Sequence, residues 1–152
     1  MEFTKTDLNK TLRVKPADMD KNRKRWRIDA TDKTLGRLAV DIAKLLLGKH
    51  KAYYSDFWDA GDFVLVENID KIKVTGNKLK NNVVYSYSWY KGNLKQVTRG
   101  VLMDKSPEKL LTKVVRGMLS KNKLRDKRMK RLKLVVWTTT KYDHFKPTVL
   151  KK

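Results

Sequence analysis

The continuous apolar run FVLV at residues 63–66 limits the folds open to this chain more than any other feature. Acidic side chains flank it, at Asp62 and Glu67. A strand that is apolar at every position is buried on both faces, which is typical of a parallel sheet covered on its faces. Because parallel strands need long crossover connections, usually helices, the run favours an α/β fold.

A strand–turn–helix unit upstream provides such a crossover. Residues 26–30 are expected to form a short strand, and Thr34 is expected to be the N-cap of the helix that follows. Apolar residues then recur at helical spacing, and Gly48 is expected to end the helix. The recurring apolar positions are Leu35, Leu38, Ala39, Ile42, Ala43, Leu45 and Leu46.

Apolar alternation and helix-start signals predict the remaining elements. Ser106 precedes a Pro and an acidic residue, which is a typical helix start, and the apolar residues after it recur at helical spacing. The further predicted elements are strands at residues 71–74, 83–90 and 134–137, a helix from Pro107 to about Met118, and a short helix within residues 121–133.

The order of these elements predicts a single α/β domain with a small, mostly parallel sheet. We expect this domain at residues 25–137, between a basic, irregular extension at 1–24 and a Lys-rich tail at 138–152. The chain has no cysteine, which excludes disulfides and cysteine-ligated zinc. Neither an apolar segment near the start nor a long apolar run occurs, so we expect a chain that is neither exported nor membrane-spanning.

Charge indicates the kind of partner. The 152 residues carry 37 Lys and Arg against 16 Asp and Glu, a formal net charge of +21. The excess is uneven, because residues 71–152 hold 23 basic and only 4 acidic side chains. A compact domain with this imbalance repels itself unless a polyanion neutralises it, so we expect a phosphate-rich partner.

The main candidate for phosphate binding is the basic run at residues 121–133. Eight of its thirteen residues are Lys or Arg, and Asp126 is the only acid. Arg125, Arg128 and Arg131 are spaced three apart, so a helix would place them on one face, which we expect to be exposed. Arg116 extends this patch toward the preceding helix.

Three basic turns, at residues 21–25, 48–51 and 75–78, are further candidates for phosphate contact. Aromatic residues lie beside two lysines: Trp89 and Tyr90 precede Lys91, and Tyr53 and Tyr54 follow Lys51 at a short distance. These rings could stack on unpaired bases, but beside strands core packing is the favoured interpretation. A membrane-surface role is disfavoured because the run 121–133 has few apolar residues.

Signals for catalysis are weak. Asp56, Asp59, Asp62 and Glu67 form an acidic cluster that could bind Mg²⁺ or act in acid–base chemistry, but Asp residues around a Gly are common in turns. His50, between two lysines, is expected to contact phosphate. The chain has no nucleotide-binding, zinc-protease or serine-hydrolase motif. We therefore expect no catalytic residue, no metal, no cofactor and no small-molecule substrate.

Five segments resemble one known family in their order along the chain. They are DATDKTLGRLA (29–39), LLLGKHKAYY (45–54), DAGDFVLVEN (59–68), DKIKVTGNK (70–78) and VVRGMLSKNKLRDKRMKRLKL (114–134). The chain resembles the bacterial-type large ribosomal subunit protein L-thirteen family over about residues 25–136. The resemblance implies a three-layer α/β/α domain around a four-stranded parallel sheet. It also implies an rRNA-binding structural protein of the large subunit that joins early in assembly and has no catalytic role.

The resemblance identifies the expected polyanion as large-subunit rRNA and implies neighbouring ribosomal proteins as further partners, in a cytoplasmic ribosome. An RNA-modifying or RNA-processing enzyme with the same basic surface is the alternative. The residues expected to contact rRNA are Arg23, Lys24, Arg25, Arg37, Lys49, His50, Lys51, Asn77, Lys78, Lys80, Arg116, Lys121, Lys123, Arg125, Lys127, Arg128, Lys130 and Arg131.

Overall fold

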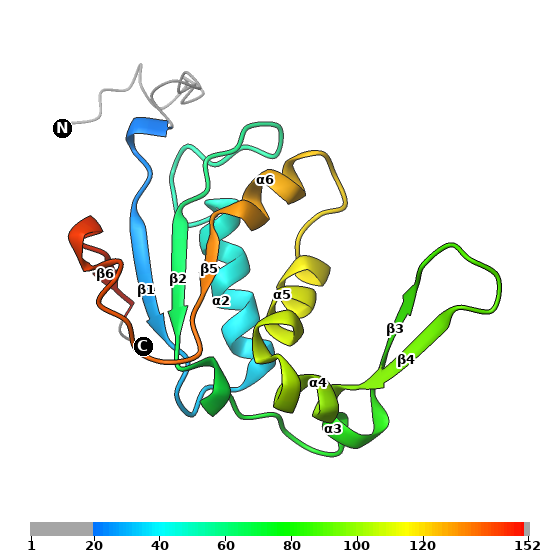
Figure 1. The fold of residues 1–152 in the computed structure, drawn as a ribbon. Coiled ribbons are helices and arrows are strands. Elements are labelled where there is room, and N and C mark those ends of the chain that lie inside the picture. Colours follow the sequence, from blue (N-terminus) through cyan, green and yellow to red (C-terminus); the bar gives the residue numbers. More distant parts are fainter. Residues whose placement is uncertain (1–19, 151–152) are drawn as a thin grey trace, which may run out of the picture.

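A four-stranded parallel sheet lies at the centre of the computed structural model, which describes residues 20–150 (Figure 1). Its strand order is β5-β2-β1-β6. The strands are β1 (Arg25–Asp29), β2 (Phe63–Glu67), β5 (Leu132–Leu134) and β6 (Thr148–Val149). The other elements are α2 (Leu35–Leu47), η1 (Ile69–Lys71), α3 (Lys78–Asn81), β3 (Val83–Tyr87), β4 (Leu94–Thr98), α4 (Arg99–Lys105), α5 (Pro107–Met118), α6 (Leu124–Lys130) and η2 (Asp143–Phe145).

The apolar run at 63–66 forms β2, one of the two inner strands. It pairs with β1 from Arg25 opposite Phe63 to Asp29 opposite Glu67, and with β5 on its other side. Val64 and Val66 are buried on one face of the sheet, and Leu65 is buried on the other. The expectation of a parallel strand covered on both faces is therefore confirmed.

Helix α2 covers one face of the sheet with the apolar residues that its sequence spacing predicts. Leu38, Ile42 and Leu46 are fully or almost fully buried. Burying one such side chain is worth about 1.5–3 kcal/mol, so this face stabilises the fold strongly. Gly48 ends the helix in the left-handed conformation with φ 82°, as predicted. Thr34 occupies the N-cap position, but its side chain makes no capping hydrogen bond.

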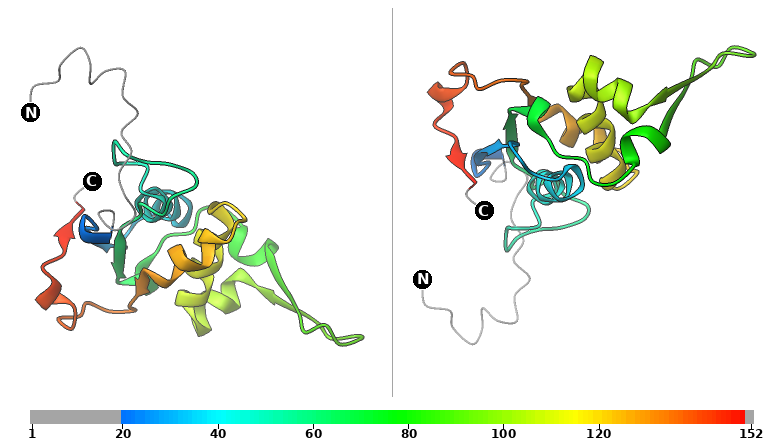
Figure 2. Two further views of the ribbon diagram at one scale, coloured as in Figure 1. Left: turned by 90° about the horizontal axis from the view of Figure 1, so that it is seen from above. Right: turned by 90° about the horizontal axis from the view of Figure 1, so that it is seen from below.

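The later helices pack on α2. Helix α5 lies along α2, α4 packs against α5, and α6 leads directly into β5 (Figures 1 and 2). Leu110, Leu111 and Val115 form the buried face of α5. The helix from Pro107 to Met118 and the short helix within 121–133 are thus confirmed.

The opposite face of the sheet is covered by the irregular segment after β5. This segment carries η2 and returns to add β6 beside β1, where Trp26 pairs with Thr148 (Figure 2). Arg27 in β1 fixes the segment, because its guanidinium contacts Asp143 at 2.7 Å and the Thr139 carbonyl at 2.7 Å. The α/β class with a four-stranded parallel sheet is confirmed, and the layer opposite α2 is a 3-10 turn with extended chain.

A two-stranded antiparallel hairpin, β3–β4, stands apart from the sheet and extends away from the body (Figures 1 and 2). It joins the body through α3 and α4, where the Arg99 amide donates to the Asn82 carbonyl at 3.0 Å. Lys113 of α5 also donates to the Tyr85 carbonyl at 3.1 Å. The hairpin therefore touches the body at its base.

Three predicted strands differ from the structure. The strand predicted at 83–90 ends at Tyr87. Residues 71–74 are predicted as a strand, but Lys71 ends η1 and only Lys73 forms a β-bridge, to Thr34. The strand expected at 134–137 is β5, which lies earlier in the chain, and Trp137 is 72% exposed. The core explains the shift, because Leu132 packs into it while Trp137 lies beyond the end of the strand. Residues 1–19, most of the expected N-terminal extension, lie outside the described residues.

Candidate nucleic-acid interface

Asp62, at the amino-terminal edge of the sheet, is the centre of a buried polar network. Its carboxylate is fully buried and accepts from the Lys24 amide at 3.0 Å and the Trp26 indole at 2.8 Å. Lys51 forms an ion pair with the same carboxylate, and His50 Nε2 lies 2.9 Å from it. A buried carboxylate needs such partners, because an unpaired charge in the interior is very costly. Asp62 therefore holds the basic turn at 48–51 against β1.

Asp59 forms a second network three residues earlier. Arg131 donates two parallel hydrogen bonds to its carboxylate, with Nη1–Oδ2 2.5 Å and Nη2–Oδ1 2.6 Å. Arg23 donates to the Asp59 carbonyl at 3.0 Å, and Arg128 Nε lies 3.6 Å from the carboxylate. Two-point pairing of this kind fixes orientation as well as charge. The network thus joins the segment before β1, the loop before β2 and the turn after α6.

Both carboxylates are held in the ionised form. Burial alone would raise the pKa of Asp62, but hydrogen bonds from Lys51, Trp26 and the Lys24 amide outweigh it, so the pKa lies below its ordinary value. For Asp59, burial also acts to raise the pKa, and the hydrogen bonds and charge of Arg131 outweigh it with help from the charges of Arg23 and Arg128. At neutral pH both groups are therefore anions that compensate nearby cations.

These networks correct part of the predicted site. Arg128 and Arg131 were expected to be exposed, but they are 1% and 8% exposed. The physical reason is the pairing with Asp59, which turns their shared helix face toward the interior. Arg125, the third member, is only half-buried.

Other predicted contacts are occupied inside the protein. Arg23, His50 and Lys51 all have carboxylate partners. His50 is predicted to contact phosphate, and in the structure its side chain lies beside the Asp62 carboxylate. Glu67 pairs with Arg27 at 3.0 Å. Of the acidic cluster considered for Mg²⁺, Asp59, Asp62 and Glu67 pair with cations, and Asp56 accepts from the Tyr54 hydroxyl. Within residues 20–150 no group of three or more acidic or His side chains could hold a metal ion.

Several of the predicted cations lie exposed around α5 and α6. Arg116 is 53% exposed and contacts Asp126, which is 72% exposed. Because this pair is open to solvent, it neutralises little of the surrounding charge. We name the exposed lysines that flank or lie on α6 the α6 patch: Lys121, Lys123, Lys127 and Lys130.

The predicted basic turn at 75–78 lies beside the start of α2 and forms a second basic region with it. The bridge between Thr34 and Lys73 places the start of α2 beside the turn at 75–78. A cavity of about 240 Å³ lies between them, and its lining includes Gly36, Lys78 and Arg99. Asn77 and Lys80 beside it are exposed, as is Arg37 in the first turn of α2. These side chains and the amino-terminal end of α2 present positive charge to one surface.

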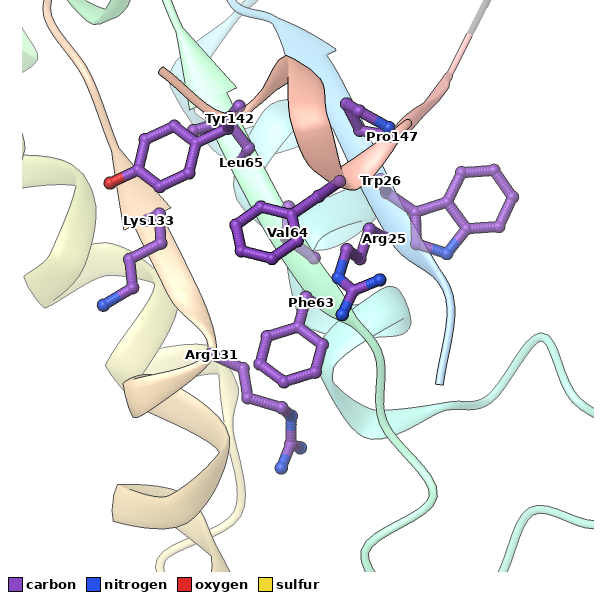
Figure 3. A pocket seen from close by; sticks show the side chains of 10 residues that line it. Arg25, Trp26, Phe63, Val64, Leu65, Arg131, Lys133, Tyr142 and Pro147 are labelled. Carbon is purple, nitrogen blue, oxygen red and sulfur yellow. The ribbon is translucent and has the colours of Figure 1, made fainter. Parts of the chain in front are cut away.

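A third cationic feature lies on the sheet face beneath the C-terminal segment (Figure 3). Phe63 and Leu65 of β2 form part of an apolar cavity of about 270 Å³, which Tyr142 helps to line. The Arg25 guanidinium lies 4.7 Å from the Phe145 ring centroid and 5.9 Å from that of Phe63. Arg25 is therefore held by cation–π contacts, with its charge near the rim of the cavity.

The aromatic side chains of the hairpin differ from the prediction. Core packing was favoured for Trp89 and Tyr90, but these side chains are 91% and 77% exposed. The expectation is wrong because β3 ends at Tyr87, so both side chains lie in the turn between β3 and β4, and the hairpin stands apart from the four-stranded sheet. Tyr54, by contrast, packs against the core, and its hydroxyl donates to Asp56. This hydrogen bond, together with burial, raises the pKa of the Tyr54 hydroxyl.

None of the helices within residues 20–150 is long and apolar enough to cross a membrane.

Comparison with known proteins identifies the family. The family model for ribosomal protein L13 matches residues 23–139.

Three curated relatives agree with the family model. The chain is 48% identical over 125 residues to the large ribosomal subunit protein uL13 of Aquifex aeolicus, which covers 82% of this chain and 85% of that protein. The protein of the same name from Pelobacter propionicus is 41% identical over 140 residues, covering 91% and 99%. That of Thermotoga petrophila is 43% identical over 137 residues, covering 90% and 89%. The resemblance seen in the sequence is thereby confirmed, and the chain belongs to the ribosomal protein L13 family.

Proposed function

We propose that this protein is a structural, rRNA-binding constituent of the large ribosomal subunit. The observation that carries the proposal is the separation of its charges. Buried or half-buried acids such as Asp59, Asp62 and Glu67 compensate cations inside the fold, whereas most cations after residue 70 lie at the surface with few acids near them. Such a surface has an affinity for closely spaced phosphates.

The proposed mechanism is charge neutralisation on a shaped surface. The α6 patch and the region around Lys78 and Arg99 would contact phosphates where RNA segments converge. Side chains cannot reach the bases in the deep, narrow major groove of A-form RNA, so recognition would depend on backbone shape and on irregular loops. The internal ion pairs keep the loop before β2 and the turn after α6 in place beneath this surface.

Family membership supports the finer parts of the proposal. The relatives are named as large ribosomal subunit proteins, so large-subunit rRNA and neighbouring ribosomal proteins are the proposed partners, in the cytoplasmic ribosome. We further propose that the protein joins the subunit early in assembly. The predicted contact residues that lie exposed are the candidates for this binding: Lys24, Arg25, Arg37, Lys49, His50, Asn77, Lys78, Lys80, Arg116, Lys121, Lys123, Lys127 and Lys130.

The alternative, an RNA-processing enzyme, needs a catalytic group that is free to react. The strongest acidic candidates, Asp59 and Asp62, are held as ionised partners of Arg131 and Lys51. A carboxylate that is fully engaged by cations is a poor general base. The arrangement therefore favours the structural role.

Co-sedimentation with ribosomal subunits across a salt gradient tests the proposal. We expect the protein to sediment with the large subunit at moderate salt and to dissociate as salt rises. A protein that remains free of the subunit and turns over an RNA substrate would overturn the structural role and support the enzyme.

A further inference from the structure

The β3–β4 hairpin presents an unusually apolar surface to solvent. Residues directly opposite each other share a face, so Tyr87 and Leu94 lie together with Tyr85 on one side of the ribbon. They are 48%, 53% and 57% exposed. A two-stranded ribbon gains little stability from its own contacts, so its exposed rings are not explained by folding.

The tip of the hairpin holds Trp89 in a defined position. Its ring lies 5.7 Å from that of Tyr87 in an edge-to-face arrangement, which continues the aromatic face of the ribbon to the tip. The Asn93 side chain donates to the Ser88 hydroxyl at 2.6 Å, and the Asn93 amide donates to the Tyr90 carbonyl at 3.2 Å. The loop is therefore closed by its own hydrogen bonds.

The backbone at Trp89 is strained, and the strained conformation exposes the indole ring. Trp89 has φ 62°, in the left-handed region that large side chains rarely adopt, although Gly92 in the same loop adopts φ 73° without strain. A glycine would suit position 89 better than a tryptophan. Strain of this kind clusters at functional sites, and here it projects an indole that is 91% exposed.

The charge around the hairpin favours a polyanionic ligand. Residues 71–103, which include the whole hairpin, contain no acidic side chain. Lys91 lies at the tip and Lys95 on β4, and both are exposed. Arg99 follows β4 at the base of the hairpin. Rings on one face with cations beside them match the two parts of a nucleotide, a base that stacks and a phosphate that needs a counter-charge.

We propose that the hairpin tip binds an unpaired base of large-subunit rRNA by stacking on the Trp89 ring, with Lys91 and Lys95 near the adjoining phosphates. This inference rests on the proposed function and adds a base-contacting site that is separate from the phosphate-binding α6 patch. A protein partner would also cover exposed rings, but the absence of any acid in residues 71–103 favours RNA over a surface of mixed charge.

Binding of the purified protein to protein-free large-subunit rRNA, measured at several salt concentrations, tests the stacking contact. The test variant is Trp89→Leu, which keeps apolar bulk and removes the π face. We expect it to weaken binding roughly tenfold while the salt slope stays unchanged, because stacking releases no counterions. Trp89→Tyr should retain most of the affinity. Lys95→Ala should instead make the affinity for rRNA less dependent on salt concentration, because one phosphate contact is lost.

Trp137→Leu is the matched control, since Trp137 is also exposed and lies outside the hairpin. It should bind like the wild type. Ultraviolet cross-linking should join rRNA to the peptide that contains Trp89, and circular dichroism should confirm that every variant is folded.

Two results would overturn the stacking site. Trp89→Leu could bind protein-free rRNA as tightly as the wild type, or Trp137→Leu could lose as much affinity as Trp89→Leu. If, in the first case, Trp89→Leu also fails to enter the large subunit, the tip is assigned to a protein partner. Failure of the wild type itself to bind rRNA is a different outcome, because it would contradict the proposed function as a whole.

Discussion

The guanidinium of Arg131 and the carboxylate of Asp59 form a two-point ion pair that joins the turn before β5 to the loop before β2. Arg131 also donates to the Leu46 carbonyl at 3.3 Å, near the end of α2. The side chains of the pair are only 9% and 14% exposed. One arginine thus holds three separate segments together, so its contribution to the protein is architectural.

Arg131→Leu is expected to lower the free energy of unfolding by about 3 kcal/mol, because Asp59 loses its main partner in a poorly solvated site. Arg131→Lys should cost less, since it keeps the charge but not the two-point geometry. Urea denaturation of both variants, of Asp59→Asn and of the double variant measures the coupling. If the losses in unfolding free energy of Arg131→Leu and Asp59→Asn simply add in the double variant, the ion pair makes no specific contribution to stability.

Gly61→Ala should destabilise the protein by about 2–4 kcal/mol through close contact with backbone. A methyl group at position 61 would lie 1.8 Å from the Leu46 carbonyl oxygen and 2.7 Å from Arg131 Nη2. The matched control is Gly117→Ala in α5, where the methyl group meets no atom within 4 Å. That change should stabilise the helix by about 0.5 kcal/mol. Thermal unfolding of both variants compares them, and equal midpoints would contradict the steric argument.

Local pattern predicted the elements that form the core and missed those that depend on distant partners. The apolar spacing predicted α2 and the FVLV run predicted β2, because in each case the segment's own apolar residues determine which side chains are buried. The strand β6 has only two residues, and it exists because Trp26 pairs with Thr148 far along the chain. The alternation at 71–74 indicated a strand, but Lys71 belongs to η1 and only Lys73 forms a β-bridge. The segment has the pattern of a strand without a neighbouring strand to pair with along its length.

The same limit applies to the candidate site. A spacing of three placed Arg128 and Arg131 on one helix face, but it could not tell whether that face meets solvent or a carboxylate. The carboxylate is Asp59, 72 residues before Arg131. The prediction for Trp89 is wrong for a related reason, since the alternation predicts a strand to residue 90, but β3 ends at Tyr87 and leaves Trp89 in an exposed turn.

Acid should destabilise the wild type through Asp62. Its pKa is lowered in the folded state, so the folded protein binds its proton less readily than the unfolded chain does. The stabilisation is present above the unfolded pKa of about 4 and is lost as pH falls through the folded pKa. Asp62→Asn should be less stable at neutral pH and less sensitive to pH below about 4.

Urea denaturation at several pH values between about 2 and 7 measures this dependence. Asp104→Asn, at an exposed position in α4, is the control and should leave the pH profile unchanged. If Asp62→Asn retained the wild-type slope in acid, the assignment of the acid sensitivity to this carboxylate would be wrong.

Two triple variants should separate RNA binding from folding. Replacing Lys121, Lys123 and Lys127 of the exposed α6 patch by Ala should weaken rRNA binding and reduce its salt slope by about 2–3, with little effect on stability. The Lys→Arg triple variant keeps the charges and should keep the slope. Replacing Arg125, Arg128 and Arg131 by Ala should instead unfold or strongly destabilise the protein, because two of these side chains are buried beside Asp59. Filter binding to large-subunit rRNA at several salt concentrations, together with thermal unfolding, distinguishes the two effects. An unchanged slope in the Lys→Ala triple variant would place the phosphate contacts elsewhere on the surface.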